Sequence, residues 1–123
     1  MIAPARVAAY QVLSALSSGR SDLPSAIART RESLADDRDR ALAADIATGV
    51  QRWRAALDHV IAHVAKRALD RLDVEVVDIL RLSAYQLLYL TRVPASAVVD
   101  DAVNLTRKMG KKKIGRASCR ERV

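Results

Sequence analysis

Apolar residues recur at intervals of three and four positions along almost the whole chain as far as residue 110. One run is formed by Ala5, Ala9, Val12 and Leu16, and a longer one by Leu42, Ile46, Val50, Trp53, Leu57, Ile61 and Val64. This spacing places side chains on one face of an α-helix and differs from the alternation of a half-buried strand. The sequence contains no Phe, and aromatic residues make up 3% of it, whereas strands favour aromatic and β-branched residues. We therefore predict an all-α domain.

Capping and helix-breaking residues divide this pattern into a compact bundle of five to six helices. Helix starts are expected at Pro4, at Asp22, within the charged run 36–40, at Asp73 and at Ser96. Helix ends are expected near Gly19, at residues 91–94, which finish in Pro94, and at Gly110. Gly49 lies inside the long run from Leu42 to Val64, where glycine costs about 1 kcal/mol relative to alanine. It predicts a bend or a close helix contact.

The length and the charge distribution limit the possible functions. A chain of 123 residues forms one ordinary domain, which excludes a two-domain enzyme. The net charge of +7 would normally indicate a nucleic acid or an anionic membrane as partner. Residues 111–123, however, hold six basic side chains against one acidic, and the preceding 110 residues hold 15 against 13. Most of the basicity therefore lies in the last thirteen residues.

The end of the chain does not resemble ordinary protein sequence. Read back into codons, residues 114–123 resemble a widely used short-read sequencing adapter translated in frame. We therefore interpret residues 1–110 as the domain and residues 111–123 as an artefactual tail of a truncated gene. A genuine basic tail that binds nucleic acid is the alternative. The single cysteine, Cys119, lies in this tail, so no disulfide, zinc cluster or cysteine nucleophile is expected.

The sequence also predicts neither a membrane segment nor a metal site. No stretch approaches the roughly 18 to 20 apolar residues that a membrane span requires, and a cytoplasmic location is the default expectation. His59 and His63 are four positions apart on one predicted helix, but no third ligand accompanies them. The aspartates of the run 36–40 alternate with arginines, which favours a solvated helix start over a cation site.

Several segments together resemble the NusB family, a helical RNA-binding fold. The resemblance is carried by residues 79–90, Val93-Pro94, residues 100–105, residues 5–13 and residues 49–58. It spans residues 5 to 110. The family pattern continues into a closing helix, where this chain has the adapter-like tail instead, so we expect a bundle with its closing helix missing and some helix surface left facing water.

The resemblance implies a function in one of two settings. Arg52-Trp53-Arg54 and the Tyr85 to Tyr89 segment are more similar to the N-terminal domain of bacterial ribosomal RNA methyltransferases acting at carbon 5 of cytosine. That setting implies S-adenosylmethionine and a catalytic cysteine in another domain, no cofactor in this chain, and no catalysis by it. The alternative is a transcription antitermination factor that binds a short RNA element with a ribosomal protein. A helical protein-interaction domain without RNA is a third possibility, and a flat salt response of binding would favour it.

Five residues are candidates for contacts with RNA: Arg6, Tyr10, Arg52, Arg54 and Arg81. Arg6 and Tyr10 are four apart on the first helix, where a guanidinium can neutralise phosphate and a ring can stack on an unpaired base at the surface. Packing of Tyr10 in the core is equally compatible with its position. Arg81 interrupts an apolar helix and, in the alternative interpretation, pairs structurally with Asp78 or another carboxylate inside the bundle. Trp53, between Arg52 and Arg54, falls on the apolar run, which predicts that it is buried.

Overall fold

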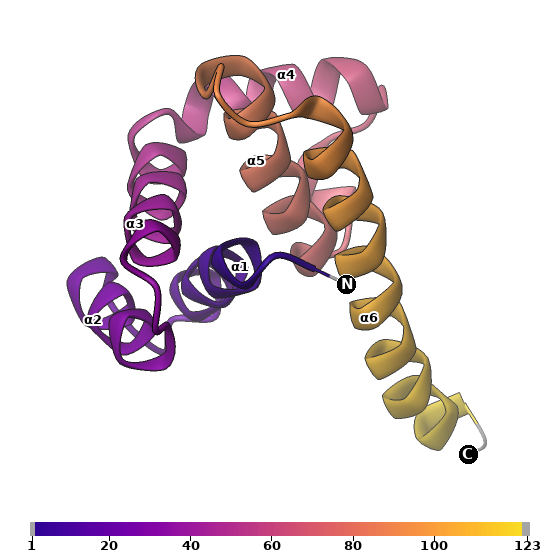
Figure 1. Ribbon diagram of the computed structural model, residues 1–123. Coiled ribbons are helices and arrows are strands. Elements are labelled where there is room, and N and C mark those ends of the chain that lie inside the picture. The colour runs from indigo at the N-terminus through magenta and orange to yellow at the C-terminus, as the bar shows by residue number, and fades with distance from the viewer. Residues whose placement is uncertain (1, 122–123) are drawn as a thin grey trace.

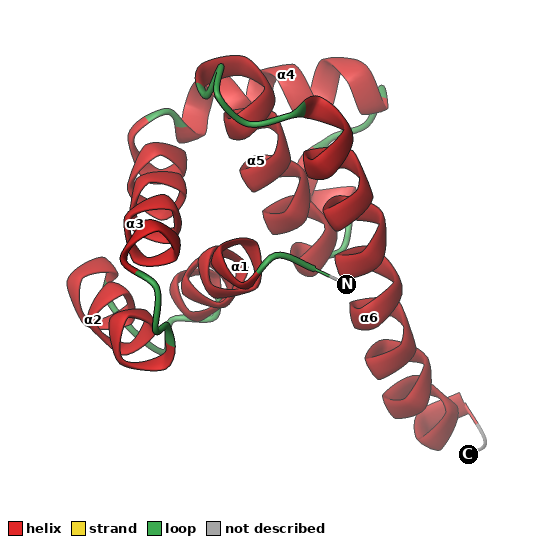
Figure 2. Ribbon diagram, viewed as in Figure 1, coloured by secondary structure: helices red, strands yellow, loops and turns green. Residues whose placement is uncertain are grey.

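The computed structural model describes the backbone of residues 2–121 and the side chains of residues 2–110. Its elements are the helices α1 (Pro4–Ser17), α2 (Leu23–Ser33), α3 (Asp37–Arg52), α4 (Arg54–Ala65), the short 3-10 helix η1 (Leu69–Arg71), α5 (Val74–Tyr89) and α6 (Ala95–Glu121). No strand occurs among residues 2–121 (Figure 2). The predicted all-α class with five to six helices is confirmed. Among the described helices, none combines the length and the apolar character needed to cross a membrane.

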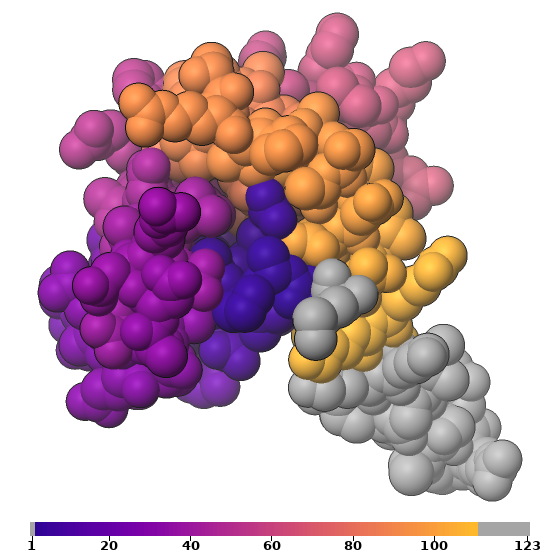
Figure 3. All heavy atoms as spheres, viewed as in Figure 1, coloured from indigo at the N-terminus to yellow at the C-terminus, as the bar shows by residue number. Residues whose placement is uncertain are grey.

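Two helices form the centre of the arrangement. α1 packs against α2, α3 and α5, and α5 packs in addition against α3, α4 and α6 (Figure 1). In the space-filling view the N-terminal residues fill the space between the α2–α3 side and the α5–α6 side (Figure 3). Polar side chains on α1 and α5 are therefore placed in the interior of the domain.

The local signals in the sequence mark most helix boundaries correctly. The Asp22 carboxylate accepts a hydrogen bond of 3.0 Å from the Ser25 N–H at the start of α2. α1 ends at Ser17, and Gly19 follows with φ of +74°, a backbone conformation that glycine adopts readily. α5 ends at Tyr89, just ahead of residues 91–94, where the restriction on the residue before Pro94 predicts a break.

Two boundaries differ from the prediction. α6 does not end at Gly110 but continues to Glu121. One glycine inside a helix costs only about 1 kcal/mol relative to alanine, which does not by itself end a helix. The helix also begins at Ala95, so Ser96 lies in its first turn. The interpretation of residues 111–123 as an artefactual tail concerns side chains outside the described residues, and it stays a prediction.

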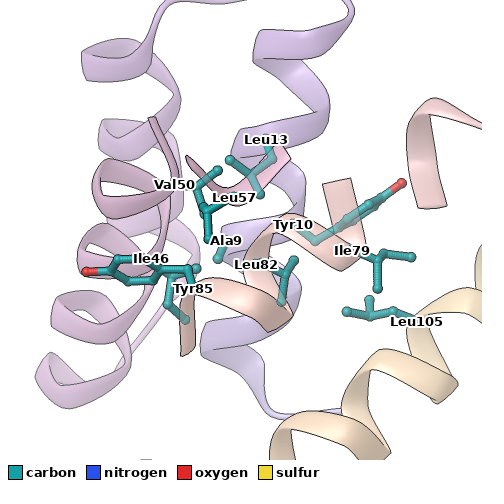
Figure 4. Packing of buried hydrophobic residues seen from close by; sticks show 10 residues of the cluster. All are labelled: Ala9, Tyr10, Leu13, Ile46, Val50, Leu57, Ile79, Leu82, Tyr85 and Leu105. Carbon is teal, nitrogen blue, oxygen red and sulfur yellow. The ribbon is translucent and has the colours of Figure 1, made fainter. Parts of the chain in front are cut away.

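The main core joins five helices. Its buried members are Ala9, Tyr10, Leu13, Ile46, Val50, Leu57, Ile79, Leu82, Tyr85 and Leu105 (Figure 4). In Figure 4 the hydroxyl ends of Tyr10 and Tyr85 point to opposite sides of this cluster, and that of Tyr85 points toward α3. The core therefore fixes the position of the Tyr85 ring against α3.

Gly49 makes the close helix contact that its position in the sequence predicts. A Cβ atom at residue 49 would overlap the ring and hydroxyl of Tyr85, which lies on the central helix α5. The helix axis bends later, at Trp53, between α3 and α4. Glycine is thus required at residue 49 by the approach of Tyr85.

We expect Gly49→Ala to destabilise the protein by about 1–3 kcal/mol, as overpacking of a core typically does. In an open helix position the same change would stabilise by up to about 1 kcal/mol. Gly110→Ala is the matched control because, beyond its own helix backbone and chain neighbours, no atom of the described residues lies within 4 Å of its Cβ position. Urea unfolding of both variants measures the difference, and a neutral or stabilising Gly49→Ala would contradict this account.

Candidate nucleic-acid interface

Three aromatic rings form a stacked row where the α3–α4 junction meets the end of α5. The Tyr85 and Tyr89 ring centroids are 5.5 Å apart, and those of Tyr89 and Trp53 are 5.4 Å apart with an angle of 12° between the ring planes. Tyr85 is buried, whereas Trp53 is 44% and Tyr89 42% exposed. We call Tyr85, Tyr89 and Trp53 the aromatic row. It runs from the core to the surface and ends in an exposed indole.

The exposure of Trp53 contradicts the sequence prediction that it is buried. Trp53 is the junction residue between α3 and α4, with φ of −105° and ψ of 20°. These angles interrupt the helical backbone, so the apolar spacing that continues across the junction no longer selects one face. The tryptophan points outward although the apolar positions on both sides of it are buried at Val50 and Leu57.

Two arginines are the sequence neighbours of Trp53 at the exposed end of the aromatic row. Arg52 and Arg54 are both exposed. Guanidinium groups neutralise phosphates, and exposed rings stack on unpaired bases. Two of the five predicted RNA contacts, Arg52 and Arg54, are therefore exposed next to Trp53 in the chain.

A pocket of about 380 Å³ lies beside the aromatic row on α3. Its polar lining consists of Asp45, Thr48 and Arg52, and Trp53 and Tyr85 supply aromatic lining. The Tyr85 hydroxyl donates a hydrogen bond of 2.8 Å to Oδ1 of Asp45. Burial and the neighbouring Asp45 carboxylate raise the pKa of Tyr85 to about 12. The phenol therefore keeps its proton at neutral pH and holds Asp45 in place.

Arg6 and Tyr10 do not lie at the surface, so their predicted surface placement is wrong, and the alternative that Tyr10 packs in the core is confirmed. Arg6 is 6% exposed, its Nε donates to Oε1 of Gln86 at 2.8 Å, and its Nη1 donates to Oδ2 of Asp101 at 2.7 Å. Tyr10 is 6% exposed and belongs to the main core. The central position of α1 is the physical reason, because helices on several sides cover it. Arg6 thus links α1 to α5 and α6.

Arg81 is also an interior side chain. Its Nε and Nη2 donate to the two carboxylate oxygens of Asp58 at 2.8 and 3.1 Å, and its Nη1 donates to Asp78 at 3.2 Å. The predicted structural pairing with Asp78 is confirmed, and the bundle buries Arg81, which is 7% exposed. Asp78 also accepts a hydrogen bond from the Ser17 hydroxyl, which joins α1 to this cluster.

Sequence reasoning did not select Tyr85, Tyr89 or Asp45 as site residues. Tyr85 and Tyr89 are four positions apart, a spacing that places both rings on one helix face. Nothing in the sequence links that face to Trp53 or to Asp45, which is 40 positions from Tyr85. Among the described residues no three His, Cys, Asp or Glu side chains are grouped as metal ligands would be.

The arrangement of the described helices around α1 and α5 defines a small helical bundle with an exposed aromatic and basic surface. The NusB family model matches residues 3–116, and the chain belongs to the NusB family. This match covers the whole predicted domain and extends six residues into the segment that we interpret as a tail.

Relatives of known name fall into two groups. The chain is 35% identical over 106 residues to ribosomal RNA small subunit methyltransferase B of Pseudomonas putida, covering 86% of this chain and 24% of that protein. It is 33% identical over 112 residues to transcription antitermination protein NusB of Sorangium cellulosum, covering 89% of this chain and 80% of that protein. The chain thus spans about a quarter of the length of the methyltransferase.

The fold is also similar to a chain in a solved structure described as the crystal structure of a plectonemic RNA supercoil. The TM-score is 0.79 and the sequence identity 22%, with 92% of this chain and 84% of the other chain covered. A sequence identity of 22% supports a shared fold and nothing about function.

Proposed function

We propose that this chain is an RNA-binding module that docks a ribosomal RNA methyltransferase on its substrate. The observation that carries the proposal is the aromatic row, which ends in an exposed tryptophan between two exposed arginines, Arg52 and Arg54. The similarity to a ribosomal RNA methyltransferase, over about a quarter of its length, supports the substrate class. The contact surface consists of Trp53, Tyr89, Arg52 and Arg54.

This surface suits unpaired RNA better than a duplex. Stacking of one base on an aromatic side chain contributes about 1–3 kcal/mol and tolerates any base, because each base has a π-face. In a duplex the bases already stack on one another, and a side chain reaches mainly the backbone and the shallow groove. We therefore assign the aromatic row to a loop or single-stranded segment of ribosomal RNA, with the arginines on its phosphates.

In this proposal the chain contributes binding and no chemistry. S-adenosylmethionine supplies the methyl group in a separate domain of the methyltransferase. The residues described here, 2–121, contain no strand, so they do not form the strand, glycine-rich loop and helix that hold dinucleotide-type cofactors. The role of the chain's own side chains is to orient the RNA.

Replacement of Trp53 or Tyr89 by alanine is expected to weaken binding of a uridine octamer roughly 5- to 150-fold, the equivalent of one lost base stack. Trp53 is the single tryptophan, so quenching of its fluorescence reports the stacking directly in the unmodified protein and in Tyr89→Ala. Fluorescence anisotropy of labelled RNA provides the same affinities for Trp53→Ala.

The matched control is Val64→Ala, which removes exposed apolar surface from the same pair of helices without touching the aromatic row. It is expected to bind like the unmodified chain. For single strands the logarithm of affinity falls with the logarithm of salt by about 0.7 per phosphate contact. Arg52→Gln and Arg54→Gln should each reduce this slope by about that amount. Equal binding by all variants, or a flat salt response, would refute the proposed surface.

A transcription antitermination factor is the second candidate function. The specific observation in its favour is that the similarity covers 80% of the antitermination protein of Sorangium cellulosum. In that case the chain binds a short RNA element together with a small-subunit ribosomal protein. Gel filtration of the chain with RNA, with and without purified ribosomal proteins, distinguishes the two: a ternary complex supports antitermination, and a binary RNA complex supports the methyltransferase module.

A further inference from the structure

We infer that the pocket beside the aromatic row receives one guanine base of the bound RNA, with Asp45 and Arg52 reading its edge. The inference rests on the proposed RNA-binding function and goes beyond it, because stacking on the aromatic row does not distinguish the bases. It gives the surface a sequence preference.

The pocket has the size and lining of a site for a small planar group. Its volume of about 380 Å³ falls in the range of roughly 300–1,000 Å³ typical of ligand pockets. The remaining lining residues are Ala41, Ala44 and Gly49. The two alanines have small side chains and leave room along α3, whereas the Tyr85 ring fills the space over Gly49. Trp53 lines the pocket and also lies at the exposed end of the aromatic row. A base stacked at Trp53 is therefore adjacent to the pocket.

Asp45 is positioned as a hydrogen-bond acceptor in this pocket. Its Oδ1 accepts from the buried Tyr85 hydroxyl at 2.8 Å, which fixes the carboxylate through a neighbouring helix. An ionised carboxylate offers about four acceptor sites, so this single bond leaves acceptor capacity on both oxygens. The residue is exposed on the pocket side. A fixed carboxylate selects a ligand with two adjacent N–H donors.

Guanine is the base that presents such a pair. Its Watson–Crick edge carries an N–H and an amino group side by side, followed by a carbonyl oxygen. Adenine and cytosine place a single amino group next to an acceptor, and uracil places its N–H between two carbonyls that would face the carboxylate. Unpaired bases in RNA complexes are read on this edge. A carboxylate therefore accepts two bonds from guanine and repels part of the edge of each other base.

Arg52 completes the complement to guanine. It lies seven positions after Asp45 on α3, hence on the same side of the helix, and lines the same pocket. Its guanidinium donates to the guanine carbonyl oxygen, as arginine commonly does. It also offsets the negative charge of Asp45, which would otherwise repel the RNA backbone. Thr48, between the two on this face, adds a hydroxyl that donates or accepts.

The test compares uridine octamers that carry G, A, C, U or inosine at one central position. We expect the unmodified chain to bind the G octamer about 5- to 100-fold more tightly than the U octamer, the discrimination typical of one bidentate contact. Inosine lacks the amino group and is expected to fall between G and U. This comparison tests whether the hydrogen-bonding groups of guanine are recognised, without any change to the protein.

The protein arm uses Asp45→Asn, which keeps a side-chain oxygen for Tyr85 but removes the second acceptor oxygen. It is expected to bind the G and U octamers equally while keeping the affinity of the unmodified chain for the U octamer. The matched control is Asp37→Asn, which removes one negative charge from the exposed start of the same helix and should preserve the preference for G. Thermal unfolding of both variants verifies that they fold.

The outcomes separate the inference from the proposed function. Tight binding of all five octamers without preference for G overturns the guanine site and leaves RNA binding intact. A preference for G that survives in Asp45→Asn also overturns the guanine site, because the Asp45 carboxylate then does not recognise the base. Failure to bind any octamer overturns the proposed function and the inference together.

Discussion

Replacing Arg81 by methionine is expected to destabilise the protein by about 3–5 kcal/mol, the cost of leaving a buried charge without its partner. The change removes the cation that pairs with Asp58 and Asp78, whose side chains are 26% and 2% exposed. Methionine retains much of the side-chain volume, so a cavity does not explain the loss. Urea unfolding at neutral pH measures it.

The loss of stability in Arg81→Met should also depend on pH. Burial raises the pKa of Asp78 above its ordinary value of 3.8, against the lowering effects of Ser17 and Arg81. Because the folded state holds this proton more tightly, the contribution of Asp78 to stability is fully present below its unfolded pKa and is lost as the pH rises through its folded pKa. Removing Arg81 raises the folded pKa further. The deficit of Arg81→Met should therefore shrink between about pH 7 and pH 4, as Asp78 takes up its proton.

The control is Arg40→Met, because Arg40 forms an ion pair with Asp37 at 3.2 Å whose side chains are 39% and 95% exposed. An exposed pair contributes about 0–1 kcal/mol, and Arg40 also donates to the carbonyl oxygens of Arg31 and Leu34. We expect a smaller loss than in Arg81→Met. Equal losses in the two variants, or a deficit of Arg81→Met that grows on acidification, would contradict the assignment of Arg81 to a buried ion cluster.

The second large loss of stability is expected when Arg6 is replaced. Arg6→Met leaves Asp101, a buried residue that also accepts from the Ala3 N–H, without its cation. We expect a loss of about 3–5 kcal/mol for the single variant. Arg6→Met combined with Asp101→Leu removes both charges and should recover most of the stability, since apolar replacements of buried ion pairs are often neutral.

The double variant also decides between two roles of Arg6. If Arg6 is purely structural, as its burial indicates, the refolded double variant binds a uridine octamer as the unmodified chain does. If Arg6 contacts RNA, the double variant is stable but binds weakly. Urea unfolding measures stability and RNA anisotropy measures binding, so the two results are independent of each other.

Arg6 and Arg81 show why a lone arginine in an apolar helix pattern is difficult to interpret. In the structure both are buried, and both have a carboxylate partner that is distant in the chain: Asp101 for Arg6 and Asp58 for Arg81. A buried guanidinium needs such a partner because desolvation of an unpaired charge is costly. Burial and pairing together become visible only when the helices are assembled.

The sequence by itself determined the all-α class, the number of helices and most helix boundaries. These depend on local terms: the helical spacing of apolar residues, the Asp22 cap, the left-handed Gly19 and the restriction before Pro94. The close contact at Gly49 was also predictable, because an interior glycine in a strong helix pattern indicates a near neighbour.

Only the tertiary structure decided which side chains form the candidate site. The dihedral angles of Trp53 turned a residue of the apolar pattern outward, and packing of α5 against α3 brought Tyr85 to Asp45. The same packing stacked Tyr89 on Trp53. These contacts join residues roughly 36 to 40 positions apart, and local propensity carries no information about such pairs. The aromatic row and its pocket arise from the assembly of helices, whereas the helices arise from the sequence pattern.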